Sequence, residues 1–132
     1  MLFVVQHASG TEGTRFLPTY SVVDIFAGPG GLAEGFSSVS GSDGTRAFDI
    51  ALSIEKDAAA HSTLRLRAFL RQFAEGLPHR YYEFLNDGGD EPDWATEFPR
   101  EWAAAVAEAW QLELGKEDPD LRLNPRLDQI RE

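Results

Sequence analysis

Residues 21–31 read SVVDIFAGPGG, and this stretch decides the fold of the chain. Its first six residues form a short β-branched and aromatic run, which is typical of a buried parallel strand. Three glycines and a proline follow at once and predict a tight turn, because glycine adopts backbone conformations that other residues avoid. Apolar residues at helical spacing, Leu32 and Phe36, come next. The stretch therefore predicts a strand, a glycine turn and a helix.

A second strand and a second helix follow in the same order. Residues 48–54 alternate in character and end on Glu55, as expected for a strand. Asp57 is a suitable N-cap for a helix to about Phe73, along which apolar residues recur at i, i+3, i+4 and i+7. Together these elements predict a βαβα unit over residues 21–75 and hence the α/β fold class.

The segments on either side of this unit have a different character. Residues 1–20 show no sustained period and predict an irregular lead-in. The chain up to Tyr82 carries a net charge of −1 and the remainder −9. Residues 83–120 therefore predict an acidic helical insertion, with a helix over residues 100–114 whose tryptophans share one buried face. A last helix is expected to open at Asn124 within the single domain of residues 21–132.

Composition excludes several classes of protein. The chain has 132 residues, no cysteine and a net charge of −10. It therefore holds no disulfide, thiolate zinc site or cysteine nucleophile, and its charge argues against gripping nucleic acid with its own surface. No apolar run reaches the ~20 residues that a membrane helix needs, so we expect no membrane partner and a cytoplasmic location. The three histidines lack metal-ligand spacing, so no metal site is predicted.

The glycine turn has three interpretations when residue patterns alone are considered. It is either a plain tight turn, a dinucleotide site or an S-adenosylmethionine (SAM) site. Gly28, Gly30 and Ala33 fit the G-x-G-x-x-G/A fingerprint of dinucleotide-binding domains, and Glu55 ends the next strand as that fingerprint requires. A SAM site uses the same geometry, because its glycines also admit the ligand to the backbone and its carboxylate also receives ribose hydroxyls. The spacing leaves the two ligands open.

Two blocks of sequence resemble a known family. Residues 24–32, DIFAGPGGL, closely resemble the first motif of the DNA (cytosine-5)-methyltransferases. Residues 51–57, ALSIEKD, and 60–69, AHSTLRLRAF, look like the second motif and following helix of a bacterial subgroup. The resemblance spans residues 22–73. It implies a Rossmann-like SAM-dependent methyltransferase fold that is incomplete, with the first βαβα units followed by the acidic insertion.

The resemblance also implies a set of cofactor-binding residues. Phe26 would pack near the adenosine, Glu55 would receive the ribose hydroxyls, and Asp24 would order the turn or attract the ammonium group of SAM. Lys56 is a departure, since many members carry an adenine-stacking aromatic residue there. No acid could be placed after a third strand, where the family has its third cofactor motif. The backbone that would wrap the methionine part of SAM belongs to Ala27, Gly28, Pro29, Gly30, Gly31 and Leu32.

The family's catalytic machinery has no counterpart in this chain. Its Pro-Cys nucleophile and its Glu-Asn-Val tripeptide are both missing from the sequence. The resemblance therefore implies an N-terminal portion that is inactive alone, with no catalytic residue of its own. DNA would be a partner of the complete enzyme only, and a complementing C-terminal chain could supply the nucleophile. The alternatives are a non-catalytic SAM-binding module, one half of a split methyltransferase and, less favoured, an NAD-binding domain.

Overall fold

A mixed α/β architecture is seen in the computed structural model, which describes residues 2–6, 19–116 and 122–132. Its four-stranded sheet has the order β1-β2-β3-β4. Strands β2 (Tyr20–Ile25), β3 (Phe48–Glu55) and β4 (Ala109–Gln111) are parallel, whereas β1 (Leu2–Gln6) pairs antiparallel with β2. The α/β class is therefore confirmed, with three parallel strands side by side.

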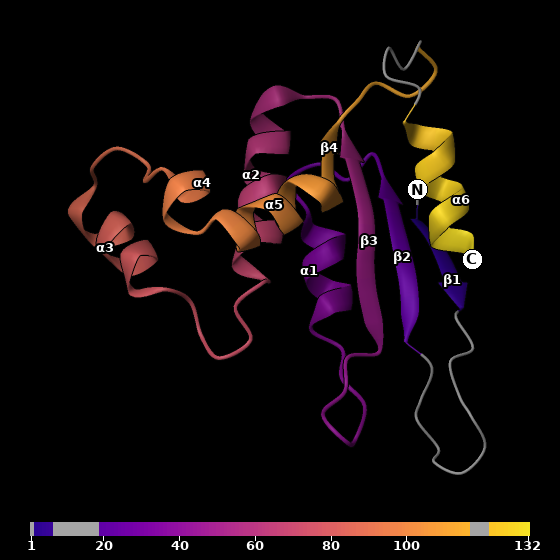
Figure 1. Cartoon of the computed structure of the whole chain (residues 1–132), viewed down its shortest axis with the longest axis horizontal. Coiled ribbons are helices and arrows are strands. Elements are labelled where there is room, and N and C mark those ends of the chain that lie inside the picture. Colours follow the sequence, from indigo (N-terminus) through magenta and orange to yellow (C-terminus); the bar gives the residue numbers. More distant parts are fainter. Residues whose placement is uncertain (1, 7–18, 117–121) are drawn as a thin grey trace.

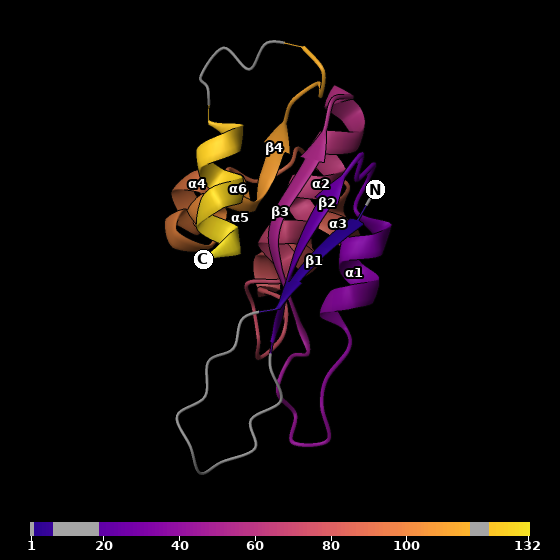
Figure 2. The same cartoon turned by 90° about the vertical axis from the view of Figure 1, so that its right-hand side faces the viewer.

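Helices cover both faces of the sheet (Figures 1 and 2). Helices α1 (Gly31–Ser37), α2 (Ala58–Leu70) and α5 (Pro99–Glu108) lie on one face, and α6 (Leu123–Arg131) lies on the other. Alternating strand residues supply the two cores. Val22 packs with Ala33 of α1, while Val23 packs with Ile130 of α6.

The pairing of β2 with β3 contains a β-bulge. Val22 lies opposite Ile50, but Val23 lies opposite Leu52, so Ala51 is the extra residue. Beyond this point the register continues with Asp24 opposite Ser53. The bulge therefore decides which residues lie opposite one another at the carboxyl ends of the two strands.

Helix α2 forms much as its sequence predicts. The side chain of Asp57 accepts a hydrogen bond from the backbone N–H of Ala60 at 2.8 Å, which confirms the N-cap. The helix ends at Leu70 rather than at Phe73. Its buried side chains Leu64 and Phe69 belong to a core cluster that also contains Trp94. Helices α4 (Trp94–Glu97) and α5 and strand β4 pack against this helix in one core cluster.

Residues 2–6 form strand β1, where an irregular lead-in was predicted. The strand is held by pairing with β2, from Leu2 opposite Asp24 to Gln6 opposite Tyr20. A strand stabilised by a distant neighbour leaves no helical or strand period of its own in five residues. The rest of the predicted lead-in, residues 7–18, lies outside the described residues.

The predicted helix over residues 100–114 is wrong beyond Glu108. There the chain turns into β4, which pairs through Ala109, Trp110 and Gln111 with the last three residues of β3. Trp110 consequently lies on a strand and does not share a helix face with Trp102. The acidic segment is thus not only an insertion, because its second half carries the third parallel strand.

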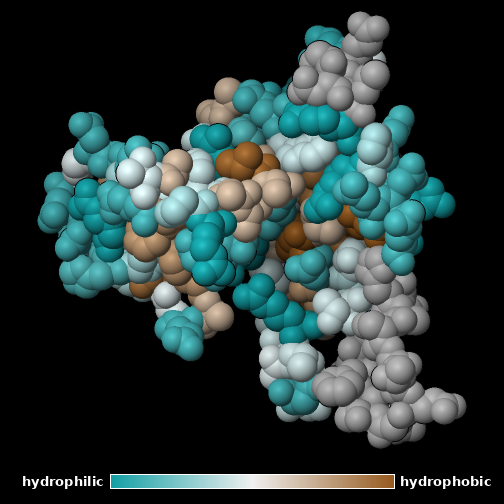
Figure 3. Space-filling model, in the orientation of Figure 1, coloured by the Kyte–Doolittle hydropathy of each residue, from teal (hydrophilic) through white to brown (hydrophobic). Residues whose placement is uncertain are grey.

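The remaining helices form a lobe beside the sheet (Figure 1). It consists of α3 (His79–Asp87) and α4 (Trp94–Glu97). Trp94, which is 2% exposed, anchors the lobe to Phe69 with their ring centroids 5.2 Å apart. Hydrophilic residues cover most of its visible surface (Figure 3). Within residues 2–6, 19–116 and 122–132, none of the helices has the length and apolar character needed to cross a membrane.

Candidate functional site

The glycine turn lies where β2 ends, at the carboxyl edge of the parallel strands. Gly28 and Gly30 both adopt left-handed backbone conformations, with φ of 56° and 91°. The backbone N–H of Ala27 donates to the carbonyl of Ile54 at 2.9 Å, and Gly30 N–H donates back to Ala27 at 3.1 Å. The turn is therefore stabilised by one hydrogen bond within itself and one to β3.

Phe26 is held in an unusual conformation at the start of this turn. Its φ is 61°, and it is the sole non-glycine residue with positive φ in the described ranges. Its side chain is 64% exposed even though it is a large aromatic residue. A left-handed backbone costs a non-glycine residue on the order of 1–3 kcal/mol and concentrates at functional sites. The strain and the exposure together mark Phe26 as a residue poised to contact a ligand.

Helix α2 packs closely beneath the turn. A Cβ atom on Gly30 would lie 2.8 Å from Cδ1 of Leu64, so any other residue at this position would have to displace that fully buried side chain. Arg67, one turn further along α2, donates from Nη1 to the carbonyl of Pro29 at 3.0 Å. The glycine therefore serves close helix packing as well as the left-handed turn.

Glu55 connects the turn to the start of α2. Its Oε2 accepts a hydrogen bond from Gly28 N–H at 2.8 Å, and its Oε1 accepts from Lys56 N–H and Asp57 N–H, each at 2.8 Å. The pKa of the Glu55 carboxyl is lowered, first by the hydrogen bond from Asp57 N–H. The sequence placed Glu55 in the candidate site, and the fold brings its carboxylate directly to the glycine turn.

Asp24 lies beneath the turn and is fully buried. It is opposite Ser53 in the β2–β3 register. Within the described part of the chain, neither carboxylate oxygen of Asp24 nor the hydroxyl of Ser53 has a hydrogen-bond partner. Burial raises the pKa of Asp24. Unpartnered buried polar atoms are costly, so the pair is a candidate contact for a bound polar group.

A second wall of the site follows β4. Leu112, Glu113 and Leu114 line a cavity of about 80 Å³ together with Phe26, Ile54 and Lys56. Glu113 lies 3.8 Å from Lys56 Nζ and 2.8 Å from Lys116 Nζ. The hydrogen bond from Lys116 lowers the pKa of Glu113. Lys56, predicted as a site residue, thus lies across the cavity from an acid that was not predicted.

Glu113 lies just after the third parallel strand, the position for which no acid could be placed from the sequence. It follows the third parallel strand by two residues, at the same edge of the sheet as Glu55. It was missed because residues 109–111 continue the apolar spacing of α5. The signal that could have found it is the order apolar, acid, apolar at Leu112, Glu113 and Leu114, directly after the short run of residues 109–111.

His61 is a further residue whose environment differs from expectation. A position on the helix surface was predicted, but the side chain is 8% exposed. Its Nε2 lies 3.1 Å from the carbonyl oxygen of Ala109, the first residue of β4. His61 therefore joins α2 to β4 and supports the second wall from beneath.

The predicted site residues thus gather at one edge of the sheet, with Glu113 added to them. Such an edge, at the carboxyl ends of parallel strands, is where open α/β sheets bind ligands. The exposed ring of Phe26, the acceptor oxygens of Glu55 and the buried Asp24 are suited to a ligand with apolar, hydroxyl and cationic parts. No protein-family model, no curated protein and no solved structure matches this chain.

Proposed function

We propose that this chain is the SAM-binding portion of a DNA (cytosine-5)-methyltransferase, built on an incomplete Rossmann-like fold. The observation that carries the proposal is the contact between Glu55 Oε2 and Gly28 N–H beneath the strained, exposed Phe26. It unites the first and second sequence motifs in one site. The resemblance of residues 24–32 and 51–69 supplies the identity of the ligand.

The residues present fit SAM part by part. The ring of Phe26 and the apolar side chains of Leu112 and Leu114 would hold the adenine. Glu55 has about one acceptor site left for a ribose hydroxyl, since a carboxylate offers about four lone-pair sites and three are used. Glu113 would accept from the adenine amino group. When bound, SAM supplies the electrophilic methyl group.

Asp24 has a specific part in this proposal. Its carboxylate is fully buried and has no hydrogen-bond partner among the described residues. An ammonium group approaching through the glycine turn would provide the missing partner and would stabilise the ionised form. The backbone of residues 27–32 would surround the methionine part of SAM, because its three glycines have no side chains that would block the ligand.

Charge favours SAM over a dinucleotide. The residues assigned to the candidate site include three acids, Asp24, Glu55 and Glu113, against one basic residue, Lys56, and the whole chain carries −10. The sulfonium and ammonium groups of SAM are cations, whereas the pyrophosphate of NAD is a dianion. Like charges at close range are repulsive, so an acidic site disfavours the dinucleotide. An NAD-binding domain is therefore the weaker alternative.

The chain would not transfer the methyl group by itself. The sequence contains no cysteine, so no thiolate is present to attack the cytosine ring. Catalysis would require a complementing chain that supplies the nucleophile and the main DNA contacts. A module that only binds SAM would share the site described here and would differ in having no such partner.

Calorimetry on the full chain tests the proposal. We expect SAM and its demethylated product to bind, and NAD to bind more weakly or not at all. Tighter binding of NAD, or no binding of SAM and its product, would overturn the assignment. Glu75→Gln, which changes an exposed acid outside the site, serves as the control and should leave the affinity unchanged.

A further inference from the structure

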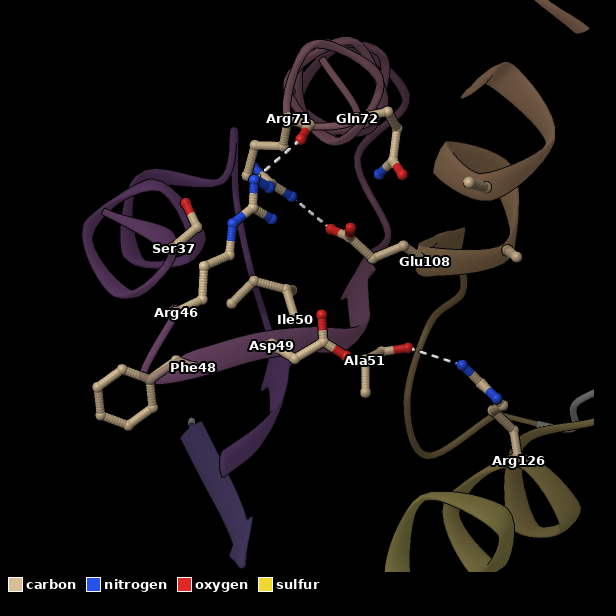
Figure 4. Close-up of a pocket in the computed structure, with 12 residues that line it drawn as sticks. Ser37, Arg46, Phe48, Asp49, Ile50, Ala51, Arg71, Gln72, Glu108 and Arg126 are labelled. Carbon is tan, nitrogen blue, oxygen red and sulfur yellow. Dashed lines mark hydrogen bonds and ion pairs between the residues drawn. The ribbon is translucent and has the colours of Figure 1, made fainter. Parts of the chain in front are cut away.

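A second cavity lies at the opposite end of the sheet, away from the glycine turn (Figure 4). Its volume is about 320 Å³, and it opens between the first half of β3, the end of α2 and α5. Charged side chains dominate its lining: Arg46, Asp49, Arg71, Glu108 and Arg126. No residue of the candidate cofactor site lines it.

Arg71 is at the centre of this charged cluster. It is the C-cap of α2, and its side chain is only 9% exposed. Nη1 donates to Oε1 of Glu34 on α1, and Nη2 donates to Oε1 of Glu108 at the end of α5. The guanidinium group therefore holds carboxylates from two other elements at once, an arrangement that its planar fork favours over a lysine.

Glu108 faces charges from every element packed around it. Arg71 of α2 is its ion-pair partner, and Glu34 of α1 and Asp49 of β3 are nearby like charges. Arg46 Nη2 donates to the backbone carbonyl of Arg71 at 3.4 Å, and Figure 4 shows Glu108 and Asp49 directed toward the space beside these two arginines. Arg126 of α6 lies further off and donates to the carbonyl of Ala51 at 2.9 Å. Two carboxylates, those of Glu34 and Glu108, thus share the guanidinium group of Arg71, and Asp49 adds a third negative charge nearby.

The position of Glu108 links this cluster to the other end of the sheet. Glu108 is the last residue of α5 and immediately precedes β4. Strand β4 has three residues, and Leu112 and Glu113 of the candidate site follow them directly. A strand this short makes few ladder hydrogen bonds, so its placement depends on what holds its first residue. His61 of α2 bonds Ala109 itself, and Arg71, the C-cap of the same helix, bonds Glu108 immediately before the strand.

We propose that Arg71 is a positioning residue of the candidate cofactor site. By holding Glu34 and Glu108 together, it fixes the start of β4 relative to α1 and so sets the Leu112–Glu113 wall against the glycine turn. The placement of β4 by Arg71 follows from the geometry, and only its consequence for cofactor affinity rests on the proposed function.

The ionisation of Glu108 gives this arrangement a pH dependence. Burial, opposed by Arg71, raises the pKa of Glu108 to about 7. We call the form closed when Glu108 is buried against Arg71. When this contact opens, Glu108 returns to water and its pKa falls toward the usual 4.5. The closed form therefore binds the proton more tightly, and it is favoured at acidic pH and loses stability as the pH rises from about 4.5 through about 7.

Amide hydrogen exchange on the full chain tests the role of Arg71 in holding β4. In wild type, protection of the amides of residues 109–112, corrected for the intrinsic pH effect, should fall roughly tenfold between pH 5.5 and pH 8. Glu108→Gln should abolish this fall. Arg71→Met should lower the protection of these amides roughly tenfold at pH 8, where the ionised Glu108 would lose its charged partner, and Arg71→Lys should do so by less. Arg100→Met, at an exposed position on α5, is the matched control.

A rescue experiment separates positioning from a general loss of stability. Adding Glu34→Gln and Glu108→Gln to Arg71→Met removes the two carboxylates that lost their partner. The triple variant should fold and lose the pH dependence, while β4 stays less protected than in wild type because the link to α1 is gone. Unchanged β4 protection in both Arg71 variants, or a retained pH dependence in Glu108→Gln, would overturn the proposal.

Binding measurements separate this proposal from the proposed function. The affinity for the demethylated product of SAM should fall at least fivefold in Arg71→Lys, and the wild-type affinity should decrease from pH 6 to pH 8 in parallel with β4 protection. Wild type that fails to bind while β4 exchange behaves as predicted would refute the proposed function and leave the positioning role intact. Normal binding in an Arg71 variant with a loosened β4 would refute the coupling to the cofactor.

Discussion

The carboxylate of Glu55 accepts a hydrogen bond from the backbone N–H of Gly28 at 2.8 Å, so the end of β3 is bonded to the turn that ends β2. The same side chain also accepts from the first backbone N–H groups beyond β3. One residue therefore orders the turn in the free protein and provides acceptors for a ligand. This dual role leads to the first prediction.

Glu55→Gln should weaken binding of the demethylated product of SAM by about 1–3 kcal/mol, because ligand hydroxyls would lose a charged acceptor. It should also change the acid sensitivity of the fold. The pKa of Glu55 is lowered, so its stabilising contribution is present above its usual pKa and is lost as the pH falls below about 4.5. Calorimetry and acid titration followed by circular dichroism measure the two effects. Equal acid sensitivity in variant and wild type would contradict the second.

Gly30→Ala should destabilise the protein by more than the cost of a left-handed alanine. The added Cβ would meet Leu64 at 2.8 Å in addition to the strain at φ 91°. Gly44→Ala is the matched control, because its φ of 80° is similar and nothing lies within 4 Å of the added atom. We expect about 1 kcal/mol for Gly44→Ala and at least 1 kcal/mol more for Gly30→Ala in urea unfolding. Equal losses would show that α2 does not constrain the turn.

Phe26→Gly should be more stable than Phe26→Ala, and both variants should bind the ligand less tightly than wild type. Glycine relieves the strain at φ 61°, and the exposed ring contributes little burial, so the free energy of unfolding should exceed that of Phe26→Ala by about 1 kcal/mol. Both variants should lose affinity for SAM because both lack the ring. Thermal unfolding and calorimetry test this opposition of stability and binding. Full affinity in either variant would remove Phe26 from the site.

Asp24→Asn should stabilise the free protein near neutral pH while weakening ligand binding. Burial raises the pKa of Asp24, so ionisation costs stability as the pH rises above the usual 3.8. The amide cannot ionise, and the gain should be on the order of 1 kcal/mol at pH 7. Asp87→Asn, at an exposed position, controls for the change in net charge. A loss of stability in Asp24→Asn would indicate that the carboxylate has a structural partner.

Local sequence was sufficient for the elements that depend on local signals. The turn at Gly28 and Gly30, the N-cap at Asp57 and the placement of Glu55 at the end of a strand all follow from residue type and short-range spacing. These are the parts of the site in which the backbone conformation dictates the residue.

Long-range pairing explains what the sequence did not reveal. Strand β1 exists because β2 offers it an edge, and β4 exists because the last residues of β3 do so. Neither has a period that distinguishes it from a loop or from the end of a helix. Glu113 was missed with β4, and the burial of His61 follows from its contact with Ala109. A contact between a side chain and a backbone carbonyl 48 residues away leaves no pattern in the local sequence.

The bulge at Ala51 makes the length of β3 a determinant of the site. Because the register shifts by one residue there, Asp24 meets Ser53 and Ile25 meets Ile54, and the strand reaches the turn with Glu55 in phase with Gly28. Removing one residue from β3 would rotate the rest of the strand to the opposite face. The loop between α1 and β3 is also paired near its base, where Ser40 lies opposite Arg46, but its tip has no such register. Insertions and deletions are therefore expected to accumulate in residues 41–45 among natural variants of this chain, and to spare the eight residues of the strand.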